Sequence, residues 1–452
     1  MSRLGPIAAL AAAAALSACS TAQRVGDVLW PFGDDNAPTE TAPQDGRISI
    51  LTFEQQLSPD PALAGQRPTV PLAVNVSDWN QPGGVPDNSP PNAIGSTALE
   101  QLWRADLGAG SDNEVKLAAP PVVSEGRLYF LDADHRVHAI DANDGGRIWT
   151  RELRPERRRD RGARGGGLAA IGGRVFVATG FGFAAALDAA TGDEIWRTPG
   201  GAPFHAAPTV AGGRVFATTN DSELIAMDVN SGEVLWTYQA IAEPARILSS
   251  SSVAVDGETV IAPFASGELV ALLAANGRRL WSDSLSRTGR LTSLSAINDI
   301  AGRPVVEGAV AYAVSHSGVL AALDLRSGER IWARPFASTQ TPFVAGGVLY
   351  AVSVDGELAA FSAETGGVYW VTQLRRYEDE GDRTGRIAWA GPIMVGGNLV
   401  LANSLGEVIA VAPENGSITA RNDVRQEVSI PPITAGGQIY FVTDEARLVV
   451  MR

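Results

Sequence analysis

The sequence predicts an all-β protein, an eight-bladed β-propeller, from three observations: a phrase that recurs along the chain, eight hairpin signals, and a strand-like segment ahead of the first repeat. The clearest copies of the phrase read Asp-Ala-Ala-Thr-Gly-Asp-Glu-Ile-Trp at 188–196 and Asp-Val-Asn-Ser-Gly-Glu-Val-Leu-Trp at 228–236. Short strands that repeat with a period of about 40 residues are typical of propellers.

The recurring phrase has a mechanical explanation. Its Asp is expected to accept hydrogen bonds from turn amides, and its Gly to supply a left-handed backbone position. Its Trp is expected between adjacent blades, with the indole N–H bonded. An alanine six residues before each glycine leaves room for close approach of the sheets. We therefore expect the phrase to hold blades together without doing chemistry. The glycines of the seven copies are Gly145, Gly192, Gly232, Gly277, Gly328, Gly366 and Gly416.

Each repeat is expected to contribute four antiparallel strands, as a propeller blade requires. The first strand ends in a two-residue turn signal, which favours a type I′ hairpin. A second strand, such as 174–178, leads to another turn and then to a third strand, such as 319–324; the fourth strand carries the Trp. The eight signals lie at 125–126, 172–173, 212–213, 256–257, 307–308, 346–347, 396–397 and 436–437.

The ring is predicted to close through the N-terminal part of the propeller. The eighth repeat stops after its third strand, at Arg452. Residues 98–103 resemble a fourth strand, and Trp103 lies 46 residues before Trp149. Pairing this strand with the last repeat covers the remaining sheet edges. The predicted propeller domain is therefore 98–452.

The chain begins with a predicted lipoprotein signal peptide, residues 1–18. Its apolar run, 4–16, is too short to span a bilayer of ~30 Å as a helix. Leu16-Ser17-Ala18-Cys19 resembles a lipobox, which implies cleavage before Cys19 and its acylation (palmitate). Ser20, in place of an Asp, favours sorting to the outer membrane. The alternative is a plain signal peptide with an incidental Cys.

Residues 19–97 are predicted to form a lipid-anchored, Pro-rich tether. Eleven prolines and the lack of a propeller repeat favour a flexible link for most of this stretch. Two segments stand out: 47–53 alternates weakly, as a strand would, and 79–84, which begins with Trp79, is a candidate for contact with the propeller.

Composition and charge exclude several classes of function. The net charge of −14 disfavours non-specific nucleic-acid binding. One cysteine excludes an internal disulfide and a Cys-rich zinc site. His135 and His138 are three residues apart, which places them on opposite faces of a strand and argues against a metal pair. The arginine-rich stretch 154–164 is either a solvated loop or a contact for an acidic partner or lipid headgroups. The acidic stretch 377–382 is expected to be a solvated rim loop.

The phrase resembles the tryptophan-docking repeat of the quinoprotein propellers, which bind pyrroloquinoline quinone in alcohol and glucose dehydrogenases. The resemblance covers 98–452 and implies, as an alternative, a periplasmic quinone-dependent dehydrogenase. A vicinal Cys pair and a calcium-binding carboxylate accompany the quinone in those enzymes. The propeller part of this chain has no Cys, and we expect no cofactor, no metal site and no catalytic residue.

A closer resemblance joins the lipobox, the Pro-rich stretch and the eight-bladed domain to the BamB lipoprotein family. The sequences of residues 318–332 and 399–406 are similar to the corresponding sequences of that family. The resemblance implies a non-enzymatic scaffold of the outer-membrane β-barrel assembly (BAM) complex, lipid-anchored at the periplasmic face of the outer membrane. It further implies binding to the periplasmic POTRA domains of BamA, association with the other lipoproteins of the complex, and assistance to unfolded outer-membrane proteins as possible clients. An unrelated periplasmic binding propeller is a third hypothesis.

The same resemblance implies two partner-binding loops on one rim. The first has the family pattern Leu-x-Leu-Arg, at which this chain carries Arg246, Ile247 and Leu248. Ile247 matches the second leucine, whereas Leu248 occupies the arginine position. The second loop has the pattern Asp-x-Asp; in this chain Asp299 matches and Ala301 departs. Arg246, Ile247, Leu248 and Asp299 are therefore the expected partner-binding residues.

Overall fold

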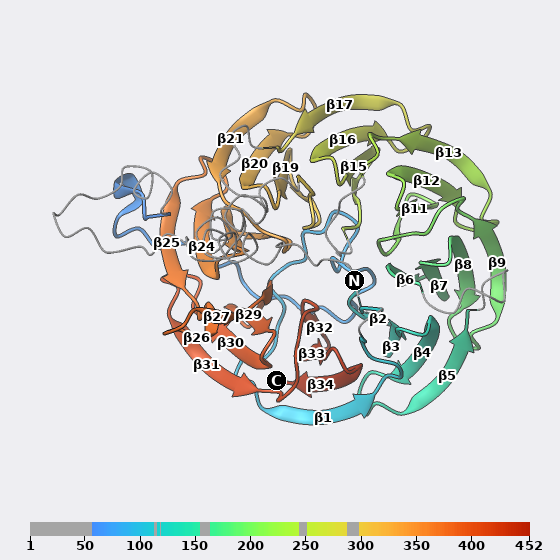
Figure 1. Ribbon diagram of the computed structural model, residues 1–452, viewed down its shortest axis with the longest axis horizontal. Coiled ribbons are helices and arrows are strands. Elements are labelled where there is room, and N and C mark those ends of the chain that lie inside the picture. Colours follow the sequence, from blue (N-terminus) through green and yellow to red (C-terminus); the bar gives the residue numbers. More distant parts are fainter. Residues whose placement is uncertain (1–56, 113–114, 118, 154–162, 244–250, 287–297) are drawn as a thin grey trace, which may run out of the picture. The chain divides into compact units, whose positions relative to one another are not determined.

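The computed structural model describes residues 57–112, 115–117, 119–153, 163–243, 251–286 and 298–452. These residues belong to one compact unit, Leu57–Arg452. They form eight four-stranded antiparallel sheets arranged as a ring (Figure 1), one two-stranded hairpin and the short 3-10 helix η1 (Pro61–Leu63). The prediction of an eight-bladed propeller is confirmed.

Each of blades 1 to 8 runs from an inner strand near the ring axis to an outer strand at the rim. Inner strands are β2 (Val122–Ser124), β6 (Gly166–Ile171), β10 (Thr209–Ala211), β14 (Ala254–Asp256), β18 (Val305–Glu307), β22 (Phe343–Ala345), β28 (Trp389–Val395) and β32 (Ile433–Ala435). Second strands are β3 (Arg127–Leu131), β7 (Arg174–Thr179), β11 (Arg214–Thr218), β15 (Thr259–Pro263), β19 (Val310–Val314), β23 (Val348–Val352), β29 (Asn398–Asn403) and β33 (Gln438–Val442).

Third strands are β4 (Arg136–Asp141), β8 (Phe183–Asp188), β12 (Glu223–Asp228), β16 (Glu268–Leu273), β20 (Val319–Asp324), β24 (Glu357–Ser362), β30 (Glu407–Val411) and β34 (Arg447–Met451). Outer strands are β5 (Arg147–Glu152), β9 (Glu194–Pro199), β13 (Val234–Gln239), β17 (Arg279–Ser284), β21 (Arg330–Pro335), β25 (Val368–Gln373), β31 (Ile418–Asp423) and β1 (Gln101–Asp106). The hairpin strands are β26 (Tyr377–Asp379) and β27 (Thr384–Arg386).

Blade 8 closes the ring as the sequence predicts. Strand β1 pairs antiparallel with β34, and Trp103 lies opposite Val450. In Figure 1 the light-blue β1 lies beside the red β34. The strand starts three residues later than the predicted segment. Closure makes blades 8 and 1 neighbours, and Tyr440 of blade 8 donates a hydrogen bond to the Ala142 carbonyl of blade 1 at 3.1 Å.

Tryptophans join successive blades in the way the phrase predicts. The Trp196 indole N–H, for example, donates to the Val229 carbonyl of the next blade at 3.2 Å. A Cβ at Gly232 would lie 2.6 Å from the Trp196 ring, and Gly232 has φ +73. The glycine therefore meets two needs, a left-handed backbone and space for the indole of the preceding blade. The other phrase tryptophans that donate to the next blade are Trp149, Trp236, Trp281, Trp332 and Trp370.

The regular spacing of alanine within the phrase has a structural reason beyond close sheet packing. Ala186 lies directly opposite Trp196 across the β8–β9 pair, and Ala226 lies opposite Trp236. A small side chain at this position leaves the face of the blade open for the indole. Inner, second and third strands are buried along most of their length because each blade lies between two others. Such strands read as continuous apolar runs, as strands covered on both faces do.

The turn prediction is right for six hairpins and wrong for two. At 172–173 both glycines have positive φ, as a type I′ turn requires. In blades 4 and 5 the loops are shifted by one residue, to Gly257-Glu258 and Gly308-Ala309, and only the glycine has positive φ. A positive φ at the first loop residue alone fits a type II′ turn.

Residues 57–97 depart from the predicted tether. Within the compact unit, residues 69–97, which we term the axial segment, run across the centre of the ring (blue in Figure 1). Trp79 is buried, which confirms the contact expected for 79–84. The segment lacks regular strands because its own backbone groups bond to the inner strands of many blades, one or two at a time. Sequence alone does not reveal such scattered partners.

The axial segment touches every blade. Hydrogen bonds link Trp79 to Val123 in blade 1, Asn80 to Ala170 in blade 2, Gln81 to Val210 in blade 3, Pro86 to Val255 in blade 4, Asp87 to Val306 in blade 5, Ala93 to Met394 and Gly396 in blade 7, and Val76 to Gly436 in blade 8. In blade 6, a Cβ at Gly346 would lie 2.4 Å from the Thr69 carbonyl oxygen.

The propeller therefore has two distinct faces. Because strands alternate in direction, the connections between blades and the turns between second and third strands share one face, which we term the connection face. The turns between first and second strands lie on the other, the turn face. Most axial-segment contacts are at the turn-face ends of the inner strands.

No helix among the described residues is long and apolar enough to cross a bilayer.

Candidate partner-binding surface

Of the expected partner-binding residues, Asp299 lies in a connection on the connection face, ahead of β18. Arg246, Ile247 and Leu248 lie outside the described residues, as does the arginine-rich stretch up to residue 162. Asp299 is described and only 6% exposed. The structure thus places one of the four residues, and places it inside rather than on the surface.

The segment 298–303 is wedged between blades 4 and 5. The Asp299 carbonyl accepts a hydrogen bond from the His316 N–H at 3.0 Å, which ties it to the turn between β19 and β20. On the other side, a Cβ at Gly267 would lie 2.9 Å from the Asn298 carbonyl. Ile300 is buried in the core shared by these two blades. The connection is therefore shaped by packing, and Asp299 is part of that packing.

A projecting hairpin forms a second feature of the connection face. Strands β26 and β27 pair between blades 6 and 7, where the sequence predicted a solvated loop. The side chains of 378–380 and 383–386 are exposed, as that prediction requires, but the backbone is an ordered hairpin. It carries both acidic and basic side chains.

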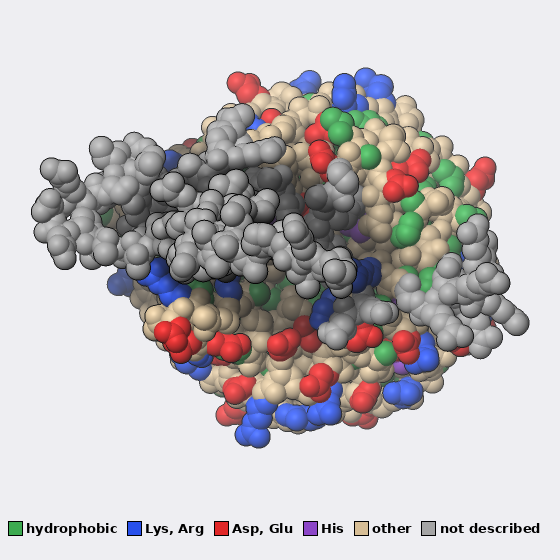
Figure 2. All heavy atoms as spheres, viewed as in Figure 1, with side chains coloured by type: hydrophobic (Ala, Val, Ile, Leu, Met, Phe, Trp, Pro, Cys, Tyr) green, Lys and Arg blue, Asp and Glu red, His purple; other side chains and the backbone are tan. Residues whose placement is uncertain are grey.

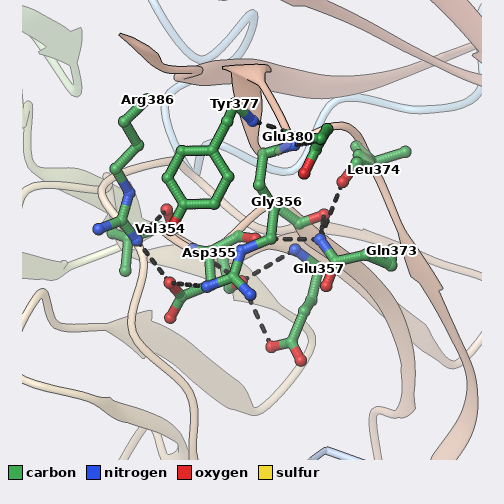
Figure 3. Close-up of polar contacts among 11 residues, drawn as sticks. Val354, Asp355, Gly356, Glu357, Gln373, Leu374, Tyr377, Glu380 and Arg386 are labelled. Atoms are coloured by element: carbon green, nitrogen blue, oxygen red, sulfur yellow. Dashed lines mark hydrogen bonds and ion pairs between the residues drawn. The ribbon is translucent and has the colours of Figure 1, made fainter. Parts of the chain in front are cut away.

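The hairpin is fastened to blade 6 by charge (Figure 3). Arg376 Nη2 lies 3.0 Å from Asp355 Oδ1, and Arg386 pairs with the same carboxylate while donating to the Val354 carbonyl at 3.0 Å. Glu380 accepts a hydrogen bond from the Arg376 N–H at 3.0 Å. Two ion pairs on one carboxylate and a hydrogen bond to the Val354 carbonyl thus join the hairpin to blade 6.

Two carboxyl groups in or near the axial segment have a raised pKa, whereas a carboxyl group of the phrase has a lowered one. Burial raises the pKa of Asp87, with a further contribution from Asp256. Burial also raises the pKa of Glu307, and Asp87 adds to it. By contrast, turn amides of Thr191 and Ala190 lower the pKa of Asp188 in the phrase. The phrase carboxylates therefore stabilise their turns as anions, as the sequence predicts.

The surface seen in Figure 2 is polar and mixed in charge. Acidic and basic side chains alternate over the described part of this face, and hydrophobic side chains form small separate groups. Besides side chains elsewhere, such as Leu72 and Ile94 of the axial segment, exposed aliphatic side chains occur on six of the outer strands, one residue before a tryptophan. They are Leu102, Ile148, Ile195, Leu235, Leu280 and Ile331. The outer strand ends the hydrogen-bonding order of its sheet, so these side chains accompany a strand edge that no other described strand covers.

Histidines do not converge on a common site. His135 lies in the turn before β4, where its Nε2 accepts a hydrogen bond from the Gly180 N–H at 3.1 Å. Burial lowers its pKa. His138 lies on β4, with Nε2 2.8 Å from Asp132 and Nδ1 3.2 Å from the Thr150 hydroxyl. Asp132 also accepts a hydrogen bond from the Ala109 N–H. These hydrogen bonds therefore fasten the β1–β2 connection to blade 1.

The calcium that the quinoprotein resemblance implies finds no donor set in the described part of the chain. No group of three or more His, Cys, Asp or Glu side chains there is arranged to hold a metal ion.

Comparison with known proteins gives a consistent family. The family profile of outer membrane protein assembly factor BamB matches residues 95–160 and 133–372. BamB of Burkholderia pseudomallei is 27% identical over 352 residues, covering 77% of this chain and 86% of that protein. BamB of Escherichia coli K12 is 28% identical over 376 residues, covering 82% and 93%.

Solved structures share the fold. BamB from Moraxella catarrhalis superposes with a TM-score of 0.65 at 20% identity, covering 78% of this chain and 99% of that one. A quinohemoprotein alcohol dehydrogenase from Comamonas testosteroni superposes with a TM-score of 0.62 at 15% identity, covering 88% and 83%. At these identities the likeness concerns the fold alone, and it does not separate an assembly factor from an enzyme.

Proposed function

The chain belongs to the family of outer membrane protein assembly factor BamB, and from this premise we propose that it is a non-enzymatic scaffold of the outer-membrane β-barrel assembly complex. The family match across 95–372 is the observation that carries the proposal. The structure supports it with a ring whose recurrent residues serve packing: indoles, glycines and Asp-capped turns hold blades together.

The proposed partner is BamA, through its periplasmic POTRA domains, at the connection face beside blades 4 and 5. Ile247 is proposed to make the apolar contact, with Arg246 and Leu248 beside it. Asp299 is buried, so we propose that it acts by shaping the 298–303 connection and not by touching the partner. Other lipoproteins of the complex are proposed to join through the same assembly.

A capture experiment tests this placement. Immobilised POTRA domains should retain the wild-type chain and lose Ile247→Glu and, more weakly, Asp299→Ala. Ile171→Glu is the matched control, because Ile171 is an exposed isoleucine at a turn-face hairpin. Equal capture of all four proteins would contradict the placement of the interface at blades 4 and 5. Failure of the wild type to bind would remove BamA as the partner.

The outer strands support a second part of the proposal, direct assistance to unfolded clients. Six of the eight pair an uncovered edge with an exposed aliphatic side chain, for example Ile195 on β9 and Ile331 on β21. Extended peptides add to such edges through main-chain hydrogen bonds. Cross-linking of a photoreactive group placed at residue 195 to an unfolded outer-membrane protein should exceed cross-linking from residue 171.

Location is proposed to be the periplasmic face of the outer membrane, with Cys19 as the acylated anchor. Several buried acyl chains, at ~0.8 kcal/mol for each methylene, give a stable attachment. Cell fractionation of Cys19→Ala should move the protein from the membrane to the soluble periplasmic fraction. A variant that stays with the membrane would remove the anchor from Cys19. The enzymatic alternative is tested separately, by quinone absorbance and dye reduction in the purified protein.

A further inference from the structure

Arg303 is an arginine embedded among three blades. It lies two residues before β18, the inner strand of blade 5, and is 8% exposed. Its backbone N–H donates to the Thr341 hydroxyl at 3.1 Å, ahead of β22 in blade 6. The neighbouring Gly302 carbonyl accepts from the Ser251 hydroxyl at 3.1 Å, ahead of β14 in blade 4. The backbone that carries this side chain is therefore held from both sides.

The guanidinium group itself has no counterpart among the described residues. Its Nε is buried without a hydrogen-bond partner, and its two terminal nitrogens form no hydrogen bond or ion pair with any residue of the described chain. Nη1 and Nη2 are not among the buried atoms that lack a partner. The small exposed area of Arg303 therefore lies at these two terminal nitrogens, the tip of the side chain. Burial lowers the pKa of Arg303 to about 10, which leaves the group charged at neutral pH.

Asp299 is four residues before Arg303 in the same buried connection, but no hydrogen bond or ion pair joins it to the Arg303 guanidinium. The connections 244–250 and 287–297, which precede the inner strands of blades 4 and 5, contain no Asp or Glu. Glu307, at the far end of β18, has its pKa raised by burial and by Asp87, as expected for a carboxyl without a cation nearby. A buried cation is normally paired, because removing it from water is costly. A charge retained without a partner indicates a place for an external anion.

We propose that the tip of Arg303 is a binding site for a carboxylate. A planar guanidinium offers two parallel N–H donors at the spacing of two carboxylate oxygens. One positive charge is neutralised by one carboxylate, whereas a doubly charged phosphate would leave an excess negative charge in the site. The carboxylate has two possible sources, an acidic side chain of a protein docked on the connection face or a small free carboxylate. This site does not depend on which protein is docked.

Peptide binding tests the site and separates the two sources. The probes are a fluorescein-labelled peptide of alternating Glu and Ser, the same peptide with Gln for Glu, and sodium acetate set against sodium chloride at equal ionic strength. Wild-type protein should bind the Glu peptide at least ten-fold more tightly than the Gln peptide in fluorescence anisotropy. Thermal unfolding in acetate reports the free carboxylate through its effect on Tm.

Arg303→Met should reduce Glu-peptide affinity at least five-fold without lowering Tm, because it removes a buried charge that has no partner in the described chain. Arg326→Met, at an exposed turn, is the matched control for lost charge and should bind as the wild type does. Arg303→Lys keeps the charge without the fork and should bind with intermediate affinity, which keeps the test valid if the Met variant folds poorly.

Each result either identifies the source of the carboxylate or contradicts the proposal. Loss of peptide binding in Arg303→Met together with no acetate effect assigns the site to a protein side chain. An acetate-dependent rise in Tm that disappears in Arg303→Met assigns it to a free carboxylate. Equal peptide affinity and equal acetate response in the wild type, Arg303→Met and Arg303→Lys would overturn the proposal.

Discussion

Removal of the Asn88 side chain tests whether the axial segment is part of the folded ring. Asn88 is 4% exposed, and its amide nitrogen donates to two blades at once, to the Pro304 carbonyl at 2.9 Å and the Val253 carbonyl at 3.4 Å. Its φ is +59, a left-handed conformation that Asn tolerates better than Ala does. One side chain thus joins blades 4 and 5 from the ring centre.

The expected loss follows from these contacts. Leaving buried carbonyls unbonded costs ~1–3 kcal/mol, with the shorter bond to Pro304 contributing more. Alanine adds ~1 kcal/mol of backbone strain at a positive φ. Asn88→Ala should therefore reduce the free energy of unfolding by about 2–4 kcal/mol. Asn88→Gly removes the same hydrogen bonds without the strain and should lose about 1–3 kcal/mol.

Urea unfolding followed by tryptophan fluorescence measures both, because the phrase indoles lie between blades and report their separation. Asn143→Ala, in an exposed turn of blade 1, is the control and should change the free energy by less than about 0.5 kcal/mol. If Asn88→Ala and Asn88→Gly both unfold at the wild-type urea concentration, residues 69–97 contribute no stability. The predicted tether would then describe them correctly.

Three further outcomes follow from the blade contacts and the buried carboxyls. Trp236→Phe should lose about 1–3 kcal/mol in the same urea assay, because it removes the 2.9 Å indole bond to the next blade; no loss would mean that the indole is held by burial alone. Gly277→Ala should cost more than about 2 kcal/mol, since its Cβ would lie 2.5 Å from the Trp236 ring at φ +70; an unchanged Tm would contradict this role of the phrase glycine. Glu307 has its folded-state pKa raised, so the folded protein binds more protons than the unfolded chain above the ordinary value of 4.5, and stability falls as pH rises through the raised pKa. Glu307→Gln should therefore gain stability relative to wild type as pH increases from about 4 to about 7, and a constant difference between the two proteins across that range would show that the carboxyl keeps its ordinary pKa.

The proposed partner-binding residues were only partly accessible to reasoning from sequence. The family pattern located Asp299 on the connection between blades 4 and 5, but a motif aligned along the chain carries no information about exposure. Asp299 is buried because these two blades close around 298–300 in space. Arg303 gave no signal at all, since a lone arginine is ordinarily solvated. That its guanidinium has no partner within the described chain becomes visible only when the blades are assembled.

Residues that recur at fixed spacing are enough to specify the ring: the number of blades, the four-strand order within each blade, the indole contacts and the closing strand all follow from them. These features are local or repeat between neighbours, so one pattern encodes them many times over. Packing in three dimensions set the role of residues 69–97 and the isolation of the Arg303 guanidinium within the described chain. Each depends on groups that are distant in the chain and converge at the ring axis or between blades, where no period in the sequence records the meeting.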